Sequence, residues 1–381
     1  MKQLKFFATL FVAALSFASC VDDETPKFVP SPSTVLGEGA FVLNQGNQRA
    51  KIGGSYSFYD WENNELNNSV FSTVNNRSLG DGPQDGVVYG SKLYVSLFGS
   101  NAVQVIDAKT HKFIRTISTP QPQGIVAHGG HVYVANNTGH VSKIDTLNLS
   151  VKQRVDVGPN PVDLVVRDGV LYVSISDGYN YNKGYANGKR LDKIDLVRFR
   201  KVGEVKLLYT EPVPLDNGRG SAEGNWEGVN PTQMTMDEDG NIFVVCLGDY
   251  AKIPAKVWKV TKEDKASTFA LGNIAAAHRH SLYVINSQTD WKTGAVSVKW
   301  DVLDTRTGKV LVEKFAQNNL PLDPIAMNVH PRTGRVLVTS RGSLDAKVKY
   351  TSPGLLYTYT NKGDLLNRST VGIEPYAVVF R

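Results

Sequence analysis

The chain repeats one phrase at a fixed spacing, and this repeat constrains the fold more than any other feature. The phrase occurs as PQDGVVYGSKLYVSL (83–97), PQGIVAHGGHVYVAN (122–136) and PVDLVVRDGVLYVSI (161–175), with a period of 39 residues. It returns in looser form at 231–246, 273–286 and 324–340. Each copy predicts two short apolar strands joined by a tight turn, and a second hairpin follows each copy, as in AVQVIDAKTHKFIRTIS (102–118).

Four strands in about 40 residues is the spacing of a β-propeller blade. Residues 375–381 form a first strand without a successor, and residues 39–45 form a second strand without a predecessor. Pairing them completes a blade from both ends, so we predict an all-β, seven-bladed propeller over residues 36–381, closed by its N- and C-terminal strands. A β-sandwich array would need units of about 100 residues, which the shorter period argues against.

The first residues predict a lipoprotein signal peptide (1–19). A basic start and an apolar run up to Leu15 lead into Phe17-Ala18-Ser19-Cys20, where Cys20 would be acylated. The alternative is an ordinary signal peptide with a chance cysteine. Residues 20–35 continue with three acids and a Pro/Ser-rich stretch, which we interpret as a flexible tether. We therefore expect a lipid-anchored protein at the cell surface, held on the outer membrane.

Charge and cysteine content narrow the function. The formal net charge is +6, and removal of Lys2 and Lys5 with the signal peptide leaves 6 − 2 = +4, without any basic block. This balance argues against nucleic acid as a partner. The second cysteine, Cys246, lies in an apolar strand pattern and is interpreted as a small buried hydrophobe.

Long insertions fall on only one face of the predicted ring. They lie between the second and third strands of a blade or between two blades, at 44–54, 176–190, 207–230, 248–255, 287–297 and 340–354. The turns inside the hairpins stay short. One-sided insertion indicates a built surface, because binding residues concentrate on loops that a rigid scaffold holds.

These insertions are rich in aromatic, amide and basic side chains, which suit a large, partly polar ligand. The candidate ligand-binding residues are Asn47, Arg49, Tyr179, Tyr181, Tyr185, Arg190, Trp226, Tyr250, Trp291, Arg341 and Tyr350. The alternative is that the aromatic residues only pack the loops onto the disc.

No catalytic motif accompanies this surface in the sequence, which lacks G-x-S-x-G, a P-loop and G-x-G-x-x-G after a strand. The histidines in the hairpin regions are dispersed, so we expect no metal site and no cofactor. Near the start of the first strands, amides outnumber acids among Gln84, Asp85, Gln123, Asp163 and Gln233. This favours recognition over hydrolysis, and we expect no enzyme activity.

The repeat PxxLVVxDGxLYVS with KID and VDVGPNP resembles the YVTN/YncE-like seven-bladed propellers over nearly all of residues 38–381. GAFVLNQGN (39–47), VGIEPYAVVF (371–380) and the acid-tagged lipobox resemble a narrower set, the corrinoid-capturing, BtuG-like outer-membrane lipoproteins. The resemblance implies that the protein captures a cobamide (vitamin B12) and passes it to a TonB-dependent outer-membrane transporter. No individual contact is carried over from that family.

Three other functions fit the same pattern. Aromatic platforms also suit a glycan, and the loop surface also suits a protein partner of the envelope. A propeller lyase or lactonase would need a bound metal. Cobamide capture remains our first hypothesis, because a corrinoid is a large flat molecule edged with amides.

Overall fold

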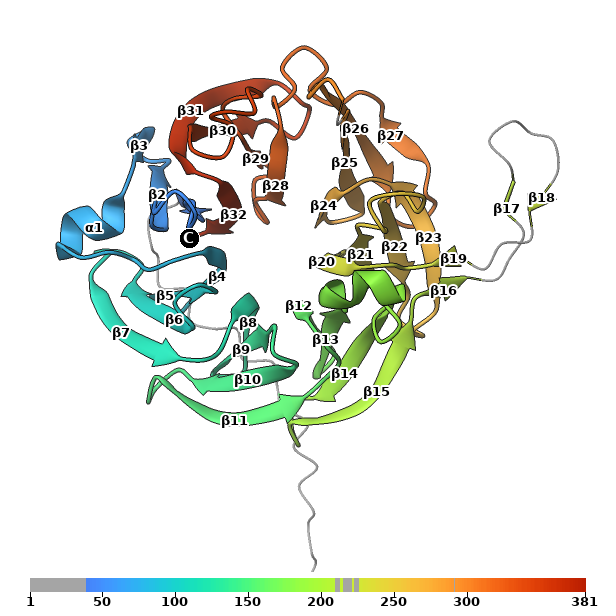
Figure 1. The fold of residues 1–381 in the computed structure, drawn as a ribbon, viewed down its shortest axis with the longest axis horizontal. Coiled ribbons are helices and arrows are strands. Elements are labelled where there is room, and N and C mark those ends of the chain that lie inside the picture. The colour runs from blue at the N-terminus through green and yellow to red at the C-terminus, as the bar shows by residue number, and fades with distance from the viewer. Residues whose placement is uncertain (1–38, 210–212, 215–220, 223–225, 291) are drawn as a thin grey trace, which may run out of the picture.

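Seven four-stranded antiparallel sheets stand around a central axis in this computed structural model (Figure 1). The structure describes residues 39–209, 213–214, 221–222, 226–290 and 292–381. The predicted signal peptide (1–19), Cys20 and its tether (20–35) lie outside the described residues. The seven-bladed, all-β architecture that the repeat predicts is confirmed.

The ring closes by strand pairing between the two ends of the propeller. β1 (Gly39–Asn44) lies between β32 (Pro375–Phe380) and β2 (Ser55–Asp60), and β3 (Glu65–Asn67) completes this closing blade, which we call blade 1. Val42 is fully buried and pairs with Val378 on one side and with Ser57 on the other. The predicted closure is therefore confirmed, and it is non-covalent.

The other six blades follow in chain order. Blade 2 has β4 (Pro83–Tyr89), β5 (Lys92–Leu97), β6 (Ala102–Asp107) and β7 (Phe113–Ser118). Blade 3 has β8 (Pro122–His128), β9 (His131–Asn136), β10 (His140–Asp145) and β11 (Ser150–Asp156). Blade 4 has β12 (Pro161–Arg167), β13 (Val170–Ile175), β14 (Arg190–Asp195) and β15 (Arg200–Lys206).

Blade 5 has β20 (Pro231–Met236), β21 (Ile242–Cys246), β22 (Lys256–Val260) and β23 (Ala266–Leu271). Blade 6 has β24 (Ile274–His278), β25 (Ser281–Thr289), β26 (Val296–Asp304) and β27 (Val310–Val312). Blade 7 has β28 (Pro324–Val329), β29 (Val336–Ser340), β30 (Pro353–Tyr359) and β31 (Leu365–Ile373).

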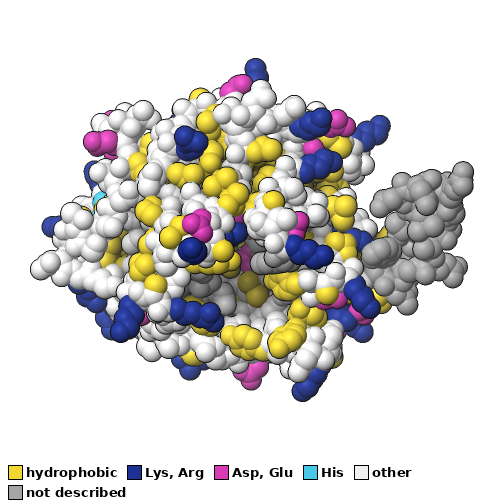
Figure 2. All heavy atoms as spheres, turned by 45° about the horizontal axis from the view of Figure 1, so that its top comes forward, with side chains coloured by type: hydrophobic (Ala, Val, Ile, Leu, Met, Phe, Trp, Pro, Cys, Tyr) yellow, Lys and Arg dark blue, Asp and Glu magenta, His cyan; other side chains and the backbone are white. Residues whose placement is uncertain are grey.

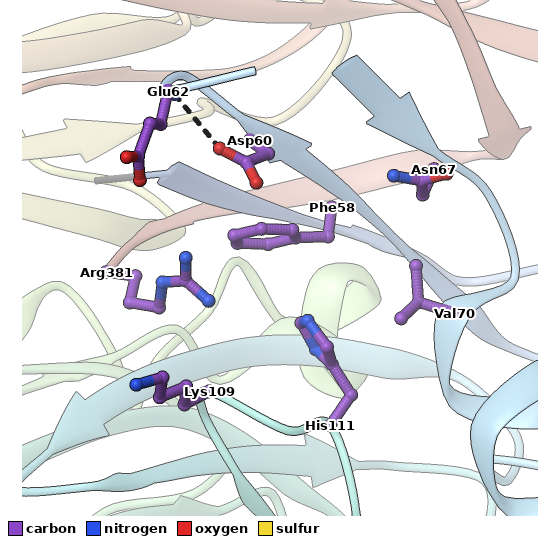
Figure 3. A pocket seen from close by; sticks show the side chains of 8 residues that line it. All are labelled: Phe58, Asp60, Glu62, Asn67, Val70, Lys109, His111 and Arg381. Carbon is purple, nitrogen blue, oxygen red and sulfur yellow. Dashed lines mark hydrogen bonds between the residues drawn. The ribbon is translucent and has the colours of Figure 1, made fainter. Parts of the chain in front are cut away.

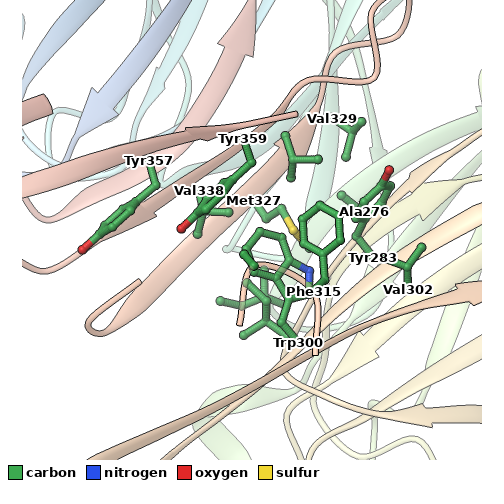
Figure 4. Packing of buried hydrophobic residues seen from close by; sticks show 14 residues of the cluster. Ala276, Tyr283, Trp300, Val302, Phe315, Met327, Val329, Val338, Tyr357 and Tyr359 are labelled. Atoms are coloured by element: carbon green, nitrogen blue, oxygen red, sulfur yellow. The ribbon is translucent and has the colours of Figure 1, made fainter. Parts of the chain in front are cut away.

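The core lies between neighbouring blades, because each sheet covers the face of the next. Between blades 6 and 7, the fully buried Trp300 ring lies 4.7 Å from Phe315 and 5.3 Å from Tyr359, centroid to centroid (Figure 4). The Tyr359 hydroxyl donates a 2.6 Å hydrogen bond to the Asn319 carbonyl. Such aromatic pairs contribute about 0.5–1.5 kcal/mol each beyond the area that they bury.

The two faces of the ring differ. We call the loop face the one formed by the connections from second to third strand and from one blade to the next. The turn face is formed by the turns within the hairpins. Between blades 4 and 5, the connection holds two small sheets, β16 (Leu208–Tyr209) with β19 (Trp226–Glu227) and β17 (Val213–Pro214) with β18 (Ser221–Ala222).

Two helical segments complete the described fold. The 3-10 helix η1 (Gly178–Lys183) lies in the loop between β13 and β14, and α1 (Val70–Asn75) follows β3 at the rim of the disc (Figure 1). Neither is long and apolar enough to cross a membrane, and the same holds for every helical part of the chain that the structure describes.

Candidate functional site

A hollow of about 690 Å³ opens near the axis on the loop face. We call it the loop-face hollow, and it is lined by residues of blades 1 to 5. In the space-filling view of Figure 2, hydrophobic side chains gather around a recess near the middle of the molecule. The volume is within the range of about 300–1,000 Å³ that is usual for small-molecule sites.

The floor of the hollow comes from one repeated position. Six of the first strands begin with proline, which suits a strand start because proline has no N–H to pair. The residue after this proline lines the hollow in five blades: Gln84, Gln123, Val162, Thr232 and Tyr376. In all five of those blades, the pairing register shifts directly after the proline. A β-bulge at this point re-aims the side chain, which explains why the position reaches the hollow.

Tyrosines from two loops form the wall. Tyr179 and Tyr181 are 67% and 70% exposed, and Tyr250 from the next blade is 70% exposed, so their ring faces are open to a ligand. Tyr185 also lines the hollow, but its ring is buried and supports the loop. The structure thus brings together four of the predicted tyrosines.

Buried asparagines hold these tyrosines in place. The Asn137 side-chain amide donates a 2.8 Å hydrogen bond to the Tyr179 hydroxyl, and the Asn160 side-chain oxygen accepts one of 3.2 Å from the Tyr179 backbone N–H. Asn230 donates a longer bond of 3.4 Å to the Tyr250 hydroxyl. All three asparagines line the hollow and are more than nine-tenths buried. The wall is therefore ordered before a ligand arrives, which lowers the entropic cost of binding.

Two of these asparagines, Asn160 and Asn230, directly precede a strand-initial proline. Gln121, Asn160, Asn230 and Glu374 occupy this position, and all four have positive φ, between 42° and 55°. Their carbonyls accept a hydrogen bond from the residue that follows the second strand, over 2.9–3.2 Å. Asparagine is one of the few residues that adopt this left-handed conformation readily.

The lining of the loop-face hollow is nearly uncharged. Among the described residues that line the hollow, Asp249 is the single carboxylic acid, and none is a lysine or arginine. The Asp249 carboxylate accepts backbone N–H bonds from Ile253, Lys252 and Ala251 over 2.7–3.0 Å, and these bonds lower its pKa. The carboxylate is thus engaged in its own turn.

Two acids lie one residue deeper, around the axis. Asp85 accepts hydrogen bonds from the backbone N–H of Gly86 and Ile125, and Asp163 accepts them from Leu164 and Met234. Each therefore links its own blade to the next. Burial raises the pKa of Asp85 to about 7, with a further contribution from Asp163, and raises the pKa of Asp163 to about 6.

A second group of predicted residues lies on the opposite side of the axis, on blades 7 and 1. The Arg341 guanidinium bonds Glu374 at 2.7 and 2.8 Å and Asp323 at 3.1 Å, and it lies 5.0 Å from the Tyr350 ring centroid. Asn47 donates a 2.9 Å hydrogen bond to the Tyr350 carbonyl. These contacts join the loops 44–54 and 340–354. None of these three predicted residues belongs to the lining of the loop-face hollow.

Of the four remaining predicted residues, Arg49 and Arg190 do not belong to the lining of the loop-face hollow. Arg49 is exposed on its loop. Arg190 is held within blade 4 by Asp192 at 2.8 Å and Glu204 at 3.3 Å, so its charge is already compensated. Trp226 pairs with Tyr209 between β19 and β16, and Trp291 lies outside the described residues.

Four lining residues were not predicted from the sequence: Asn137, Asn160, Asn230 and Tyr376. A signal for two of them was present, because the dipeptide Asn-Pro stands at 160–161 and 230–231. The other two occupy repeat positions whose direction depends on the bulges and on the hydrogen bonds to neighbouring blades.

Other reactive groups lie away from this hollow. Cys246 is buried, as predicted, and burial raises the pKa of its thiol well above the usual range, which keeps it protonated. On the turn face, His280 lies 2.6 Å from Glu238 and 3.3 Å from Asp239, two acids of the neighbouring blade that are about 40 residues away in the sequence. Within the described parts of the chain, no group of three or more histidines, cysteines or acids is arranged to hold a metal ion.

Comparison with known proteins supports the fold alone. No family model matches the chain, and no curated protein matches it in sequence. Among solved structures, hydrazine synthase from Kuenenia stuttgartiensis is similar, with a TM-score of 0.59 and 16% identity over 78% of this chain and 89% of that one. A putative 6-phosphogluconolactonase from Bacteroides uniformis has a TM-score of 0.55 and 13% identity, over 91% of this chain and all of that one.

The computationally designed Ika8 protein is also similar, with a TM-score of 0.52 and 10% identity over 90% of this chain and 96% of that one. Identities this low carry no information about ligands or chemistry. The chain is a seven-bladed β-propeller, structurally like these proteins.

Proposed function

We propose that the loop face binds a large, uncharged, amide-rich small molecule, and that this ligand is a cobamide. The observation that carries the proposal is the composition of the loop-face hollow, whose described lining has exposed tyrosine rings beside buried amides and no cationic side chain. Ring faces can stack on a flat macrocycle, and side-chain amides can hydrogen-bond carboxamides in both directions.

The hollow suits partial seating of such a ligand. A flat molecule edged with amides would lie over the floor residues Gln84 and Gln123 and against Tyr179 and Tyr250. Its outer edge would reach the Tyr350 side of the axis. The nearly uncharged lining also argues against a phosphorylated sugar, which would need cationic partners.

The biological setting of the proposal rests on the sequence. Acylation of Cys20 would tether the propeller to the outer membrane at the cell surface, and the captured cobamide would pass to a TonB-dependent transporter. Mass spectrometry of the mature N-terminus tests the anchor, with Cys20→Ala as the variant that should lose the lipid. Co-purification with the transporter tests the partner.

Titration of the full-length protein with cyanocobalamin tests the ligand, by calorimetry and by the visible absorbance of the corrinoid. We expect stoichiometric binding at micromolar protein. The absence of both heat and spectral change would contradict the proposal.

A glycan is the second candidate, because the open faces of Tyr179, Tyr181 and Tyr250 suit sugar rings equally well. A neutral oligosaccharide in the same calorimetric experiment distinguishes the two ligands. Binding of the oligosaccharide without binding of cyanocobalamin would assign the hollow to glycans.

A further inference from the structure

The turn between the third and fourth strands has a corresponding tip residue in every blade. This residue stands two positions after the aspartate or threonine that opens the turn, on the turn face. It is charged and exposed in five blades: Glu62, Lys109, Glu263, Arg306 and Lys362. In the neighbouring blades 3 and 4 it is aliphatic, namely Leu147 and Val197.

The charged tips of blades 1 and 2 lie beside a recess. Glu62 and Lys109 line a hollow of about 560 Å³ between these blades, which we call the turn-face hollow (Figure 3). Asp60 and Arg381 also line it, so two acids and two cations share its lining. Neither Leu147 nor Val197 lines this hollow or the loop-face hollow. The aliphatic tips therefore have no recess of their own.

The two aliphatic tips project into solvent. Leu147 is 90% exposed and Val197 is 83% exposed, the largest values for a large hydrophobic side chain in the part of the chain that the structure describes. A single exposed aliphatic residue needs no explanation. Here two of them occupy one repeat position in adjacent blades, where the other five blades carry a charge, which indicates a surface with its own role.

Both turns are held in place by the first hairpin of their own blade. In blade 3, the Asp145 carboxylate accepts the N–H of the tip residue at 2.9 Å, and the Thr146 hydroxyl donates a 2.7 Å hydrogen bond to the Gly130 carbonyl. In blade 4, the Leu196 N–H donates a 3.0 Å bond to the Gly169 carbonyl. The tips are therefore presented in a fixed direction.

Cations surround the two tips. Residues 143–152 and 193–201 contain six lysines and arginines and two aspartates, a net charge of 6 − 2 = +4. Lys143 joins the two turns, because its Nζ lies 5.4 Å from the centre of the Phe199 ring in the turn of blade 4. Burial and the nearby Lys152 charge lower the pKa of Lys143.

Ion pairs compensate only part of this charge. Three of the six cations are paired: Lys152 with Asp145 at 2.5 Å, Lys193 with Asp264 at 2.5 Å, and Lys201 with Asp192 at 2.8 Å. Arg198 and Arg200 are exposed, and no acid of the described residues pairs with either side chain. The Asp195 carboxylate instead accepts the Arg198 backbone N–H at 2.7 Å. Free guanidinium groups therefore stand beside Val197.

The predicted tether enters the propeller on this same face. β1 begins at Gly39, which pairs with Asp60, the residue that opens the turn of blade 1. Cys20 precedes Gly39 by 39 − 20 = 19 residues, which span at most about 65 Å when fully extended. A lipid on Cys20 would thus hold the turn face within reach of the membrane.

We infer that the turns of blades 3 and 4 dock the turn face on an anionic lipid bilayer. Leu147 and Val197 would insert among the lipids, with Arg198 and Arg200 at the headgroups. A protein partner would need a continuous packed area of about 800 Å² on each side, whereas a bilayer takes up separate aliphatic side chains and attracts the basic residues between them. This inference rests on the lipid anchor of the proposed function and not on its ligand. The docked protein would keep the loop face open to the medium.

Sedimentation of the full-length protein with lipid vesicles tests the inference. Every variant also carries Cys20→Ala, so that no acyl chain contributes and the N-terminal segment is the same throughout. Vesicles of phosphatidylcholine and phosphatidylglycerol in equal parts are anionic, and vesicles of phosphatidylcholine alone are neutral. We expect binding to the anionic vesicles to be at least about tenfold tighter than binding to the neutral ones. Equal binding to both would overturn the inference.

Replacement of the tips tests their insertion. Leu147→Asp and Val197→Asp should each weaken binding to anionic vesicles about tenfold, because each removes an aliphatic side chain from the bilayer. Leu271→Asp is the matched control, because Leu271 is 57% exposed at the end of β23, on the loop face. If the double tip variant binds as tightly as its parent, the inference is wrong and the tips are left as a contact for an envelope protein.

Reversal of the free charges tests the headgroup contact. Arg198→Glu and Arg200→Glu together should weaken binding to anionic vesicles about tenfold or more and leave binding to neutral vesicles nearly unchanged. Lys51→Glu, at an exposed position of the loop face, is the matched control. An equal loss on neutral vesicles would contradict the headgroup contact. Cyanocobalamin titration should be unchanged in the tip and arginine variants, so failure of docking and failure of cobamide binding are distinguishable.

Discussion

The loop-face hollow and the turn-face hollow occupy one scaffold but have opposite chemistry. The first has tyrosines and amides from long connections, with Asp249 as the one carboxylic acid among the lining residues that the structure describes. The second has two acids and two cations within a similar volume. The propeller therefore has two kinds of connection, long ones on the loop face and short ones on the turn face. Each kind surrounds its hollow with different types of side chain.

The short turns and the longer loops are stabilised in partly different ways, and this accounts for the difference between their side chains. Short turns between third and fourth strands begin with an aspartate whose carboxylate accepts the N–H groups two and three residues later, as at Asp107 and Asp304. These turns therefore place a negatively charged carboxylate on the turn face. The longer loops contain aspartate turns as well, at Asp249 and Asp290, and in addition they bring tyrosines and side-chain amides to the loop-face hollow.

Breaking the ring should disrupt both faces at once, and this is the largest effect that we expect. Val42→Asp places a carboxylate in the fully buried closing blade, where no partner can neutralise it. An uncompensated buried charge costs about 3–5 kcal/mol in the free energy of unfolding. Thermal denaturation should show a strongly lowered Tm or loss of the folded state.

Val202→Asp is the matched control, because Val202 is 47% exposed on the outer strand β15. It should leave the Tm nearly unchanged. Survival of cyanocobalamin binding with loss of vesicle binding in Val42→Asp, or the reverse, would show that the two faces do not depend on a common closure.

Removal of the tyrosine rings should weaken ligand binding at the loop-face hollow only. Tyr179→Ala and Tyr250→Ala each delete an exposed ring of the loop-face hollow. Each should weaken cyanocobalamin binding about tenfold or more, equivalent to ~1.4 kcal/mol, while binding to anionic vesicles stays unchanged. Calorimetry and vesicle sedimentation measure the two affinities on the same preparations.

Tyr179→Phe keeps the ring and loses only the 2.8 Å bond from Asn137, so its effect on cyanocobalamin should be smaller. If Tyr179→Phe is as harmful as Tyr179→Ala, hydrogen bonding rather than stacking dominates at this position.

The axial acids beneath the loop face should make stability depend on pH. The folded-state pKa values of Asp85 and Asp163 are raised, so the folded state binds more protons than the unfolded state between about pH 4 and 7. Their contribution to stability is therefore lost as the pH rises through this window. His111 has a lowered pKa and acts in the opposite direction, so a difference between variants is needed.

Asp85→Asn should gain stability relative to the wild type between pH 5 and pH 8. We expect about 1 kcal/mol, because both acids are partly accessible to water, which screens the charges. Urea denaturation across this pH range measures the difference. Asp156→Asn, at an exposed position on β11, should show no such trend.

The smallest effect is expected at the outer rim, far from both hollows. Leu311 is 52% exposed on the three-residue strand β27. Leu311→Lys should change the free energy of unfolding by less than about 0.5 kcal/mol and leave both affinities unaltered. A larger change would show that the outer strands contribute to the shape of the hollows.

The candidate site was predictable in part. The loops around Tyr179 and Tyr250 were identified because their length and composition departed from the repeat, and the structure places both residues at the hollow. Arg341 and Arg190 were chosen on the same grounds, yet ion pairs already compensate their charges. Arg341 pairs with Asp323 and Glu374, and Arg190 pairs with Asp192 and Glu204 of its own blade. A sequence gives the residue types in a loop but not the partners that they meet across the ring.

The sequence alone determined the number of blades, the order of strands and the closure of the ring, because strand period and apolar alternation are local properties that repeat seven times. Only the tertiary structure decided which side chains share a hollow. Asn137, Asn160 and Tyr376 converge through bulges, left-handed residues and hydrogen bonds between blades, and the turn-face hollow joins residues 60 and 381. Such non-local contacts follow from the closed ring and not from any single segment.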